Sequence, residues 1–160
     1  MVLVSPAGMP NPPILAQRIM MIPRVGEILL NLKTDYIRKL MIRMAFVFDK
    51  NLITQDYFDN LTRSHKIKGT NEVLLRTLRL RFFNTLLGEV HKLSKMDVPI
   101  LIAWGRQDKS IPFEWGQKMH EILKTSKLEV FEKSGHVCHD EHPERFNQIA
   151  IDFLSSGWEF

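Results

Sequence analysis

A histidine-rich stretch near the carboxyl end of the chain carries the side chains best suited to chemistry. It reads KSGHVCHDEHPERF over residues 133–146 and places His136, His139 and His142 three residues apart, with Cys138 among them. Imidazole and thiolate groups bind zinc, and a single imidazole can also act as a general acid and base. The stretch therefore raises two possibilities, a metal site or one working histidine with polar neighbours.

The spacing of the three histidines argues against a metal site. On a helix, side chains placed in successive steps of three residues drift around the axis, so the three rings diverge. Pro143 also disfavours the helical region for the histidine before it, and no other segment supplies a clear fourth ligand. We therefore expect no metal ion, solvent-facing side chains for His139 and His142, and a buried structural role for Cys138.

The elements around these residues predict how the working histidine is positioned. The apolar run 99–104 and the shorter run 128–131 are typical of strands, and the patterns at 113–123 and 144–154 are typical of helices. Strand, helix, strand and helix in this order predict an α/β fold with neighbouring parallel strands.

Two polar residues follow the two predicted strands. Asp108 comes just after the first strand and His136 just after the second, so adjacent parallel strands would bring them together at one edge of the sheet. A carboxylate that accepts from an imidazole N–H fixes the tautomer of the ring, as in the orienting half of a hydrolytic triad. An ordinary loop aspartate and an unremarkable histidine would fit this topology equally well.

The middle of the chain has helical periodicity. We expect helices over 14–22, over 34–48, from Thr54 toward residue 65, and from Thr70 or Asn71 through residue 86. Several of them are apolar on more than one face. Such helices either pack on another part of the protein or line a pocket for an apolar ligand.

Two segments make a family resemblance specific. VPILIAWGRQDKSIP, residues 98–112, and LEVFEKSGHVCHDEHPERFNQIAIDFL, residues 128–154, resemble the carboxyl-terminal end of the α/β-hydrolase fold, in the branch of meta-cleavage-product hydrolases and esterases. In that family the G-x-x-D loop bears the triad acid and the G-H motif bears the triad histidine. The resemblance thus implies that Asp108 and His136 hold these roles, and Glu141, Pro143 and Phe146 match the start of the following helix.

The resemblance extends to the rest of the chain. FDKNLITQDYFDNLTR, residues 48–63, is similar to the helical cap inserted after the sixth strand of this family, and VLVSPAG, residues 2–8, is similar to that strand. It implies a core strand and exit turn over 1–9, a helical cap region over 10–90 and a βαβα part of the hydrolase core over 91–160. The expected fold is therefore a partial parallel sheet with a cap insertion.

The nucleophile of the family has no match in these residues. Its motif G-x-S-x-G needs two glycines four apart, and the glycines fall at 8, 26, 69, 88, 105, 116, 135 and 157. Ser5 precedes a proline, which has no amide donor, and Ser110 lacks a glycine context. We expect a truncated or degenerate hydrolase, or one completed by another chain, that is inactive alone.

The expected function is that of a serine hydrolase acting on an ester, or on a C–C bond next to a carbonyl, in a small apolar or aromatic acyl-type substrate. No cofactor is implied, because the triad uses side chains, backbone donors and water. The alternative is a non-catalytic protein that kept the cap as a surface for apolar ligands or for protein partners.

Composition narrows the remaining possibilities. The 160 residues are 44% apolar and 25% charged, and the net charge of +4 comes from scattered Lys and Arg, which does not indicate nucleic-acid binding. One cysteine allows no internal disulfide, so we expect a reducing, cytoplasmic location. The first residues do not resemble a signal peptide, and charged or amide residues break the long apolar runs, so we expect no membrane span. A membrane-surface role for 14–32 is a weaker idea than cap packing.

Overall fold

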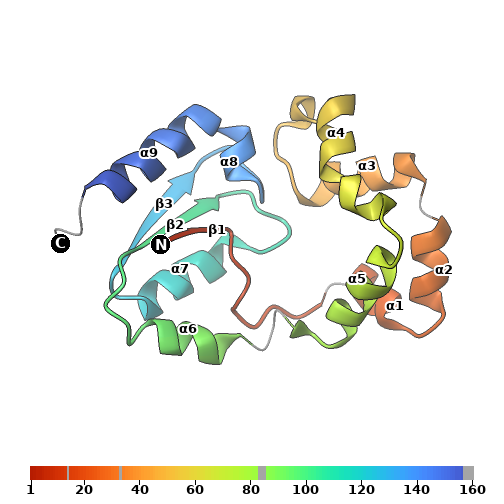
Figure 1. Ribbon diagram of the computed structural model, residues 1–160, viewed down its shortest axis with the longest axis horizontal. Helices are drawn as coiled ribbons and strands as arrows, with labels where there is room; N and C mark the ends of the chain where they lie inside the picture. Colours follow the sequence, from red (N-terminus) through yellow and green to blue (C-terminus); the bar gives the residue numbers. More distant parts are fainter. Residues whose placement is uncertain (14, 33, 83–85, 157–160) are drawn as a thin grey trace.

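The computed structural model describes residues 1–160 except 14, 33, 83–85 and 157–160. A small sheet with helices on both faces forms one part of the molecule, and a group of short helices forms the other (Figure 1). The long connection between the first two strands contains that group of helices. No helix in the described ranges is long and apolar enough to cross a membrane.

Three parallel strands make up the described sheet. They are β1 (Val2–Val4), β2 (Ile100–Gly105) and β3 (Ser126–Phe131), in the order β1-β2-β3. Leu101 lies opposite Val2 on one side and Lys127 on the other. All six residues of β2 are buried, as expected for a central strand with both faces covered. The parallel α/β arrangement predicted from the sequence is therefore confirmed.

Alternate residues of β2 face opposite layers of helices, because side chains alternate along a strand. On one face, Ile102 and Trp104 pack with residues of α6 (Leu87–Leu93) and α7 (Phe113–Ile122). On the other face, Ala103 packs with residues of α8 (Cys138–Glu141) and α9 (Pro143–Ser155). Figure 1 shows these two helical layers on either side of the sheet. Because β2 and β3 are parallel, the loops that follow them leave the sheet at the same edge.

The second group of helices lies between β1 and β2 in the sequence. Its elements are α1 (Leu15–Met21), α2 (Val25–Leu32), α3 (Asp35–Ala45), η1 (Lys50–Leu52), α4 (Gln55–Leu61), η2 (Arg63–Lys66) and α5 (Thr70–Arg79). The hydroxyl of Thr34 accepts a hydrogen bond from the Ile37 amide, and that of Thr54 accepts one from the Tyr57 amide. Both threonines therefore act as helix N-caps, as the sequence predicted for Thr54.

Some predicted boundaries differ from the observed ones. α5 begins at Thr70, and its N-cap residue is Gly69, which has a left-handed φ of 91°. The predicted caps, Thr70 and Asn71, are therefore the first two residues of the helix. It ends at Arg79, and the left-handed φ of Arg81 prevents the helix from continuing toward residue 86. Residue 14 and residues 83–85 of the predicted helices lie outside the described ranges.

The helix α6 was not predicted. Its Val90 is buried in the cluster on the α7 face of the sheet, so this helix packs on the sheet. The expected boundary between cap and core at residue 90 thus falls inside α6, and the division of the chain into three zones stays a prediction.

Candidate active site

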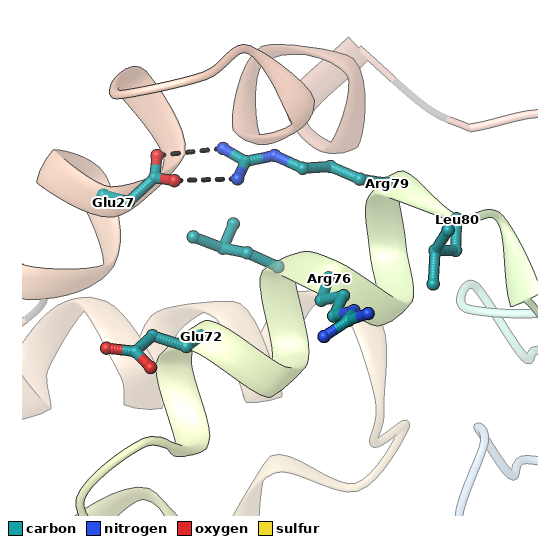
Figure 2. A pocket seen from close by; sticks show the side chains of 6 residues that line it. Glu27, Glu72, Arg76, Arg79 and Leu80 are labelled. Atoms are coloured by element: carbon teal, nitrogen blue, oxygen red, sulfur yellow. Dashed lines mark hydrogen bonds and ion pairs between the residues drawn. The ribbon is translucent and has the colours of Figure 1, made fainter.

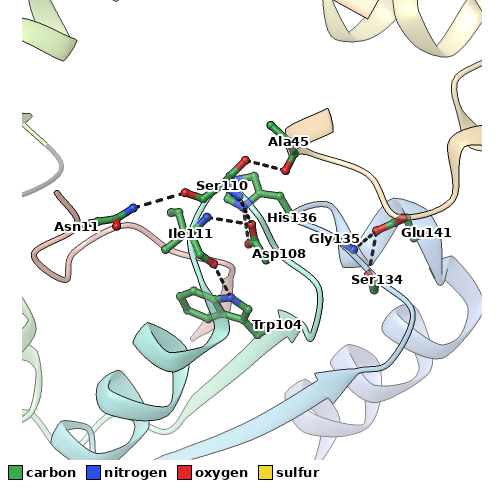
Figure 3. Close-up of polar contacts among 10 residues, drawn as sticks. All are labelled: Asn11, Ala45, Trp104, Asp108, Ser110, Ile111, Ser134, Gly135, His136 and Glu141. Carbon is green, nitrogen blue, oxygen red and sulfur yellow. Dashed lines mark hydrogen bonds and ion pairs between the residues drawn. The ribbon is translucent and has the colours of Figure 1, made fainter. Parts of the chain in front are cut away.

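The loop after β2 buries Asp108. Only 6% of this residue is exposed, and its Oδ1 accepts hydrogen bonds from the amides of Ser110 (2.8 Å) and Ile111 (2.9 Å). The buried indole of Trp104 donates to the Ile111 carbonyl at 3.1 Å, which anchors the loop to the strand that precedes it (Figure 3). One carboxylate oxygen is thereby held by the loop and the other remains available.

The loop after β3 brings His136 to that second oxygen. Nδ1 of His136 lies 2.7 Å from Oδ2 of Asp108 (Figure 3), so the structure joins the two residues that the sequence placed at successive strand ends. Because a carboxylate only accepts, Nδ1 carries the proton and Nε2 is left as the acceptor of the neutral ring. The His136 side chain is 23% exposed, and the Phe46 ring packs edge-on against it with 5.4 Å between centroids.

Backbone contacts hold the two loops together. Gln107 donates its amide to the Ser134 carbonyl (2.9 Å), and its side-chain oxygen accepts from the Ser134 amide (3.0 Å). A Cβ at Gly105 would lie 1.9 Å from the Gly135 carbonyl oxygen, so the loops come this close only because residue 105 has no side chain.

The carboxylate of a third residue, Glu141, links the histidine loop to the second group of helices. Glu141 accepts four hydrogen bonds, from the Phe48 and Asp49 amides and from the Gly135 amide and Ser134 hydroxyl. The sequence marked Glu141 only by its place in the motif after the histidine. Its partners lie in distant segments, and no local pattern pointed to them.

The other two histidines of the stretch are partly exposed, with 42% of the His139 side chain open to solvent, and they also contact aromatic rings. His139 lies on α8 with its ring 5.8 Å from that of Phe146, and the His142 ring lies 6.0 Å from that of Phe131. His139 therefore packs partly against α9 and His142 partly against β3, so neither ring faces only solvent. Among the described residues, no group of three histidines, cysteines or carboxylates is arranged to hold a metal ion.

Cys138 is fully buried, as expected. Burial raises the pKa of its thiol to about 12, and the negative charges of Asp108 and Glu141 act in the same direction. A thiol with this pKa is a poor nucleophile at neutral pH.

The two serines near the site have different surroundings. Ser110 donates its hydroxyl to the Ala45 carbonyl at 2.9 Å. Ser5 follows β1 with a left-handed φ of 38°, is 4% exposed, and its hydroxyl has no hydrogen-bond partner among the described residues. Neither lies in the sharp strand-to-helix turn of a hydrolase nucleophile, because helix α1 begins ten residues after Ser5 and Ser110 lies five residues beyond the end of β2.

A surface hollow of about 340 Å³ lies elsewhere, between α2 and α5. Its main polar contact is a bidentate pair in which Arg79 donates to both carboxylate oxygens of Glu27, at 2.7 and 2.9 Å (Figure 2). Hydrogen bonding to Arg79 lowers the pKa of Glu27 to about 2. Arg79 also donates to the carbonyls of Met21 and Ile22, so this pair joins α5 to α1 and α2.

The parallel sheet and the helices that cover it form part of an α/β-hydrolase fold. The family model described as "Alpha/beta hydrolase family" matches residues 1–149, and the chain belongs to this family. It spans about half or less of the length of the relatives that it resembles.

Three relatives illustrate the branch. A 2-hydroxy-6-oxononadienedioate/2-hydroxy-6-oxononatrienedioate hydrolase of Paraburkholderia xenovorans is 28% identical over 127 residues, which are 76% of this chain and 41% of the relative. The solved structure of a serine-to-alanine mutant of a meta-cleavage product hydrolase from Pseudomonas fluorescens has a TM-score of 0.76 at 19% identity, covering 98% of this chain and 55% of that one. An esterase of Thermogutta terrifontis has a TM-score of 0.69 at 19% identity, with coverages of 97% and 55%. The chain is thus similar to meta-cleavage-product hydrolases, and the solved structures share its fold.

Proposed function

We propose that this chain supplies the acid and the histidine of a serine-type hydrolase. The reaction is hydrolysis of an ester, or of a C–C bond next to a carbonyl, in a small apolar or aromatic acyl-type substrate. His136 is the general base and acid, and Asp108 orients it. The names of the similar hydrolases and of the esterase support these two reaction types, cleavage of a C–C bond next to a carbonyl and hydrolysis of an ester.

The observation that carries this proposal is the 2.7 Å contact between His136 Nδ1 and Asp108 Oδ2. The contact keeps the proton on Nδ1, so Nε2 is free to take a proton from a nucleophilic hydroxyl and later to return it to the leaving group. The buried carboxylate stabilises the imidazolium formed between these two steps. Only side chains and water take part in these proton transfers.

The nucleophile and the oxyanion hole have to come from residues other than those described. We therefore expect the chain by itself to have no esterase activity, because loss of the nucleophile removes the acyl-transfer route. Joining it to the preceding half of the Paraburkholderia xenovorans relative would supply a complete triad.

The test is ester hydrolysis by that chimera. With a short p-nitrophenyl ester, His136→Ala should lower kcat by about 10⁴-fold or more. His139→Ala is the matched control, because it removes a neighbouring histidine that makes no contact with Asp108 in the described structure, and it should retain the parent rate. A His136→Ala chimera as active as its parent would show that the assignment is wrong.

A second function is favoured by the exposed apolar side chains of α2 and α3. At least 45% of each of Ile28, Leu32, Leu40 and Met44 is exposed, which is typical of a surface that binds an apolar ligand or a protein. In this case the chain is a non-catalytic binding module. It should then remain folded and monodisperse alone and bind an apolar fluorescent probe saturably, and Leu32→Ser together with Met44→Ser should abolish that binding. An aggregated or unfolded chain would exclude this function.

A further inference from the structure

Both candidate-site loops contact one short segment of the cap, residues 45–49, which we call the cap junction. It begins at Ala45, the last residue of α3, and ends directly before η1. Ser110, in the loop of the acid, donates its hydroxyl to the Ala45 carbonyl at 2.9 Å, and His136 donates its amide to the Phe46 carbonyl at 2.7 Å. The cap junction is therefore bonded to the loop of the acid and to the loop of the histidine.

The carboxylate of Glu141 strengthens the second of these attachments. Its Oε1 accepts from the amides of Phe48 (2.6 Å) and Asp49 (2.8 Å) in the cap junction. Its Oε2 accepts from the amide of Gly135 (2.5 Å) and the hydroxyl of Ser134 (3.0 Å) in the histidine loop. One oxygen thus binds the cap junction and the other binds the residues directly before His136 (Figure 3 shows the Ser134 and Gly135 contacts).

Close packing surrounds this carboxylate. A Cβ on Gly135 would lie 2.5 Å from the Phe46 carbonyl oxygen and 3.1 Å from the Phe48 nitrogen, so the two backbones approach as closely as glycine allows. Val137, directly after the histidine, is buried in one cluster with Val47 of the cap junction and Phe58 of α4. The His136 amide bonds directly to the cap junction, Glu141 links the residues before the histidine to that segment, and Val137 after the histidine packs against cap residues.

We propose that Glu141 is a positioning residue that locks the histidine loop to the cap junction, so that the place of the cap sets the place of the His136 ring against Asp108. The role of this attachment in catalysis rests on the proposed function, but the attachment of the histidine loop to the cap junction does not. Four donors converge on one group, and only a carboxylate presents acceptors on both of its terminal atoms. Glutamine has the same shape, yet its NH₂ group would face one pair of donors.

The isosteric variant Glu141→Gln provides the test on the chain as it is. We expect the amides of either Phe48 and Asp49 or Gly135 to exchange with solvent about tenfold faster, because one side of the lock loses its acceptor. The NMR resonance of the hydrogen-bonded His136 Nδ1–H should shift upfield or broaden, because the ring moves relative to Asp108. Glu144→Gln, which makes the same charge change on the exposed first turn of α9, should alter neither signal.

The unmodified chain supplies a second test that does not depend on the folding of a variant. Scalar couplings across the hydrogen bonds should connect the nitrogens of Phe48, Asp49 and Gly135 to the carboxylate carbon of Glu141. Absence of these couplings, or a Glu141→Gln chain with an unchanged His136 Nδ1–H signal, would overturn the proposal. None of these measurements requires hydrolysis. They can therefore support or overturn the role of Glu141 whether or not the proposed enzymatic function is correct.

Discussion

Oδ2 of Asp108 lies 2.7 Å from Nδ1 of His136, while Oδ1 of the same carboxylate accepts from two backbone amides of its own loop. The two oxygens therefore have separate partners. The amides fix the carboxylate in the loop after β2, and the fixed carboxylate determines which nitrogen of the ring carries the proton. This division makes the effect of an isosteric change at Asp108 predictable.

Asp108→Asn should abolish most of the activity of the chimera described above while preserving its fold. An asparagine that turns its NH₂ group toward Nδ1 moves the imidazole proton to Nε2, and the ring can no longer act as a base, so kcat should fall by about 10⁴-fold. Asp152→Asn on the exposed face of α9 is the control and should retain the parent rate. Comparable rates for the two variants would argue against the orienting role.

Gly105→Ala should destabilise the protein. The new Cβ would lie 1.9 Å from the Gly135 carbonyl oxygen and 2.6 Å from that of Ser134, so the histidine loop has to move, at a cost of about 1–3 kcal/mol or more. Urea unfolding measures this loss. Gly88→Ala is the matched control, because nothing lies within 4 Å of its Cβ and alanine favours the helix α6, so the free energy of unfolding should stay unchanged or rise.

The pair of Glu27 and Arg79 should make stability depend on acidity. Hydrogen bonding to Arg79 lowers the pKa of Glu27 from 4.5 to about 2 in the folded chain, so the unfolded chain binds the proton more readily. The stabilisation is therefore complete above pH 4.5 and disappears as the pH falls toward 2. The difference in urea midpoint between the parent and Glu27→Gln should be largest above pH 4.5 and shrink on acidification. Glu72→Gln, in the same hollow, should show a smaller difference; an equal one would contradict this origin.

Cys138 should resist alkylation in the folded protein. Its thiol is fully buried and its pKa is raised to about 12, so little thiolate exists near neutral pH and reagents cannot reach it. Mass spectrometry after iodoacetamide treatment should find the native chain unmodified and the chain unfolded in guanidinium chloride fully modified. Rapid labelling of the native chain would indicate that α8 opens readily.

The sequence by itself determined the parallel sheet and the proximity of Asp108 to His136. The continuous apolar run that forms β2 predicts a strand buried on both faces, and polar residues after adjacent parallel strands meet at one edge of the sheet. These inferences depend on local patterns and on general topology, which is why they could be made without coordinates.

Only the tertiary structure decided how the segment between α3 and η1 is attached to the histidine loop. Glu141 binds amides 93 and 92 residues before it, at Phe48 and Asp49, and an amide donor is present at nearly every position of a chain. The sequence therefore cannot indicate which donors a carboxylate reaches. The helix α6 was missed for a related reason: it is short, and its packing on the sheet, rather than a long periodic pattern, determines where it lies.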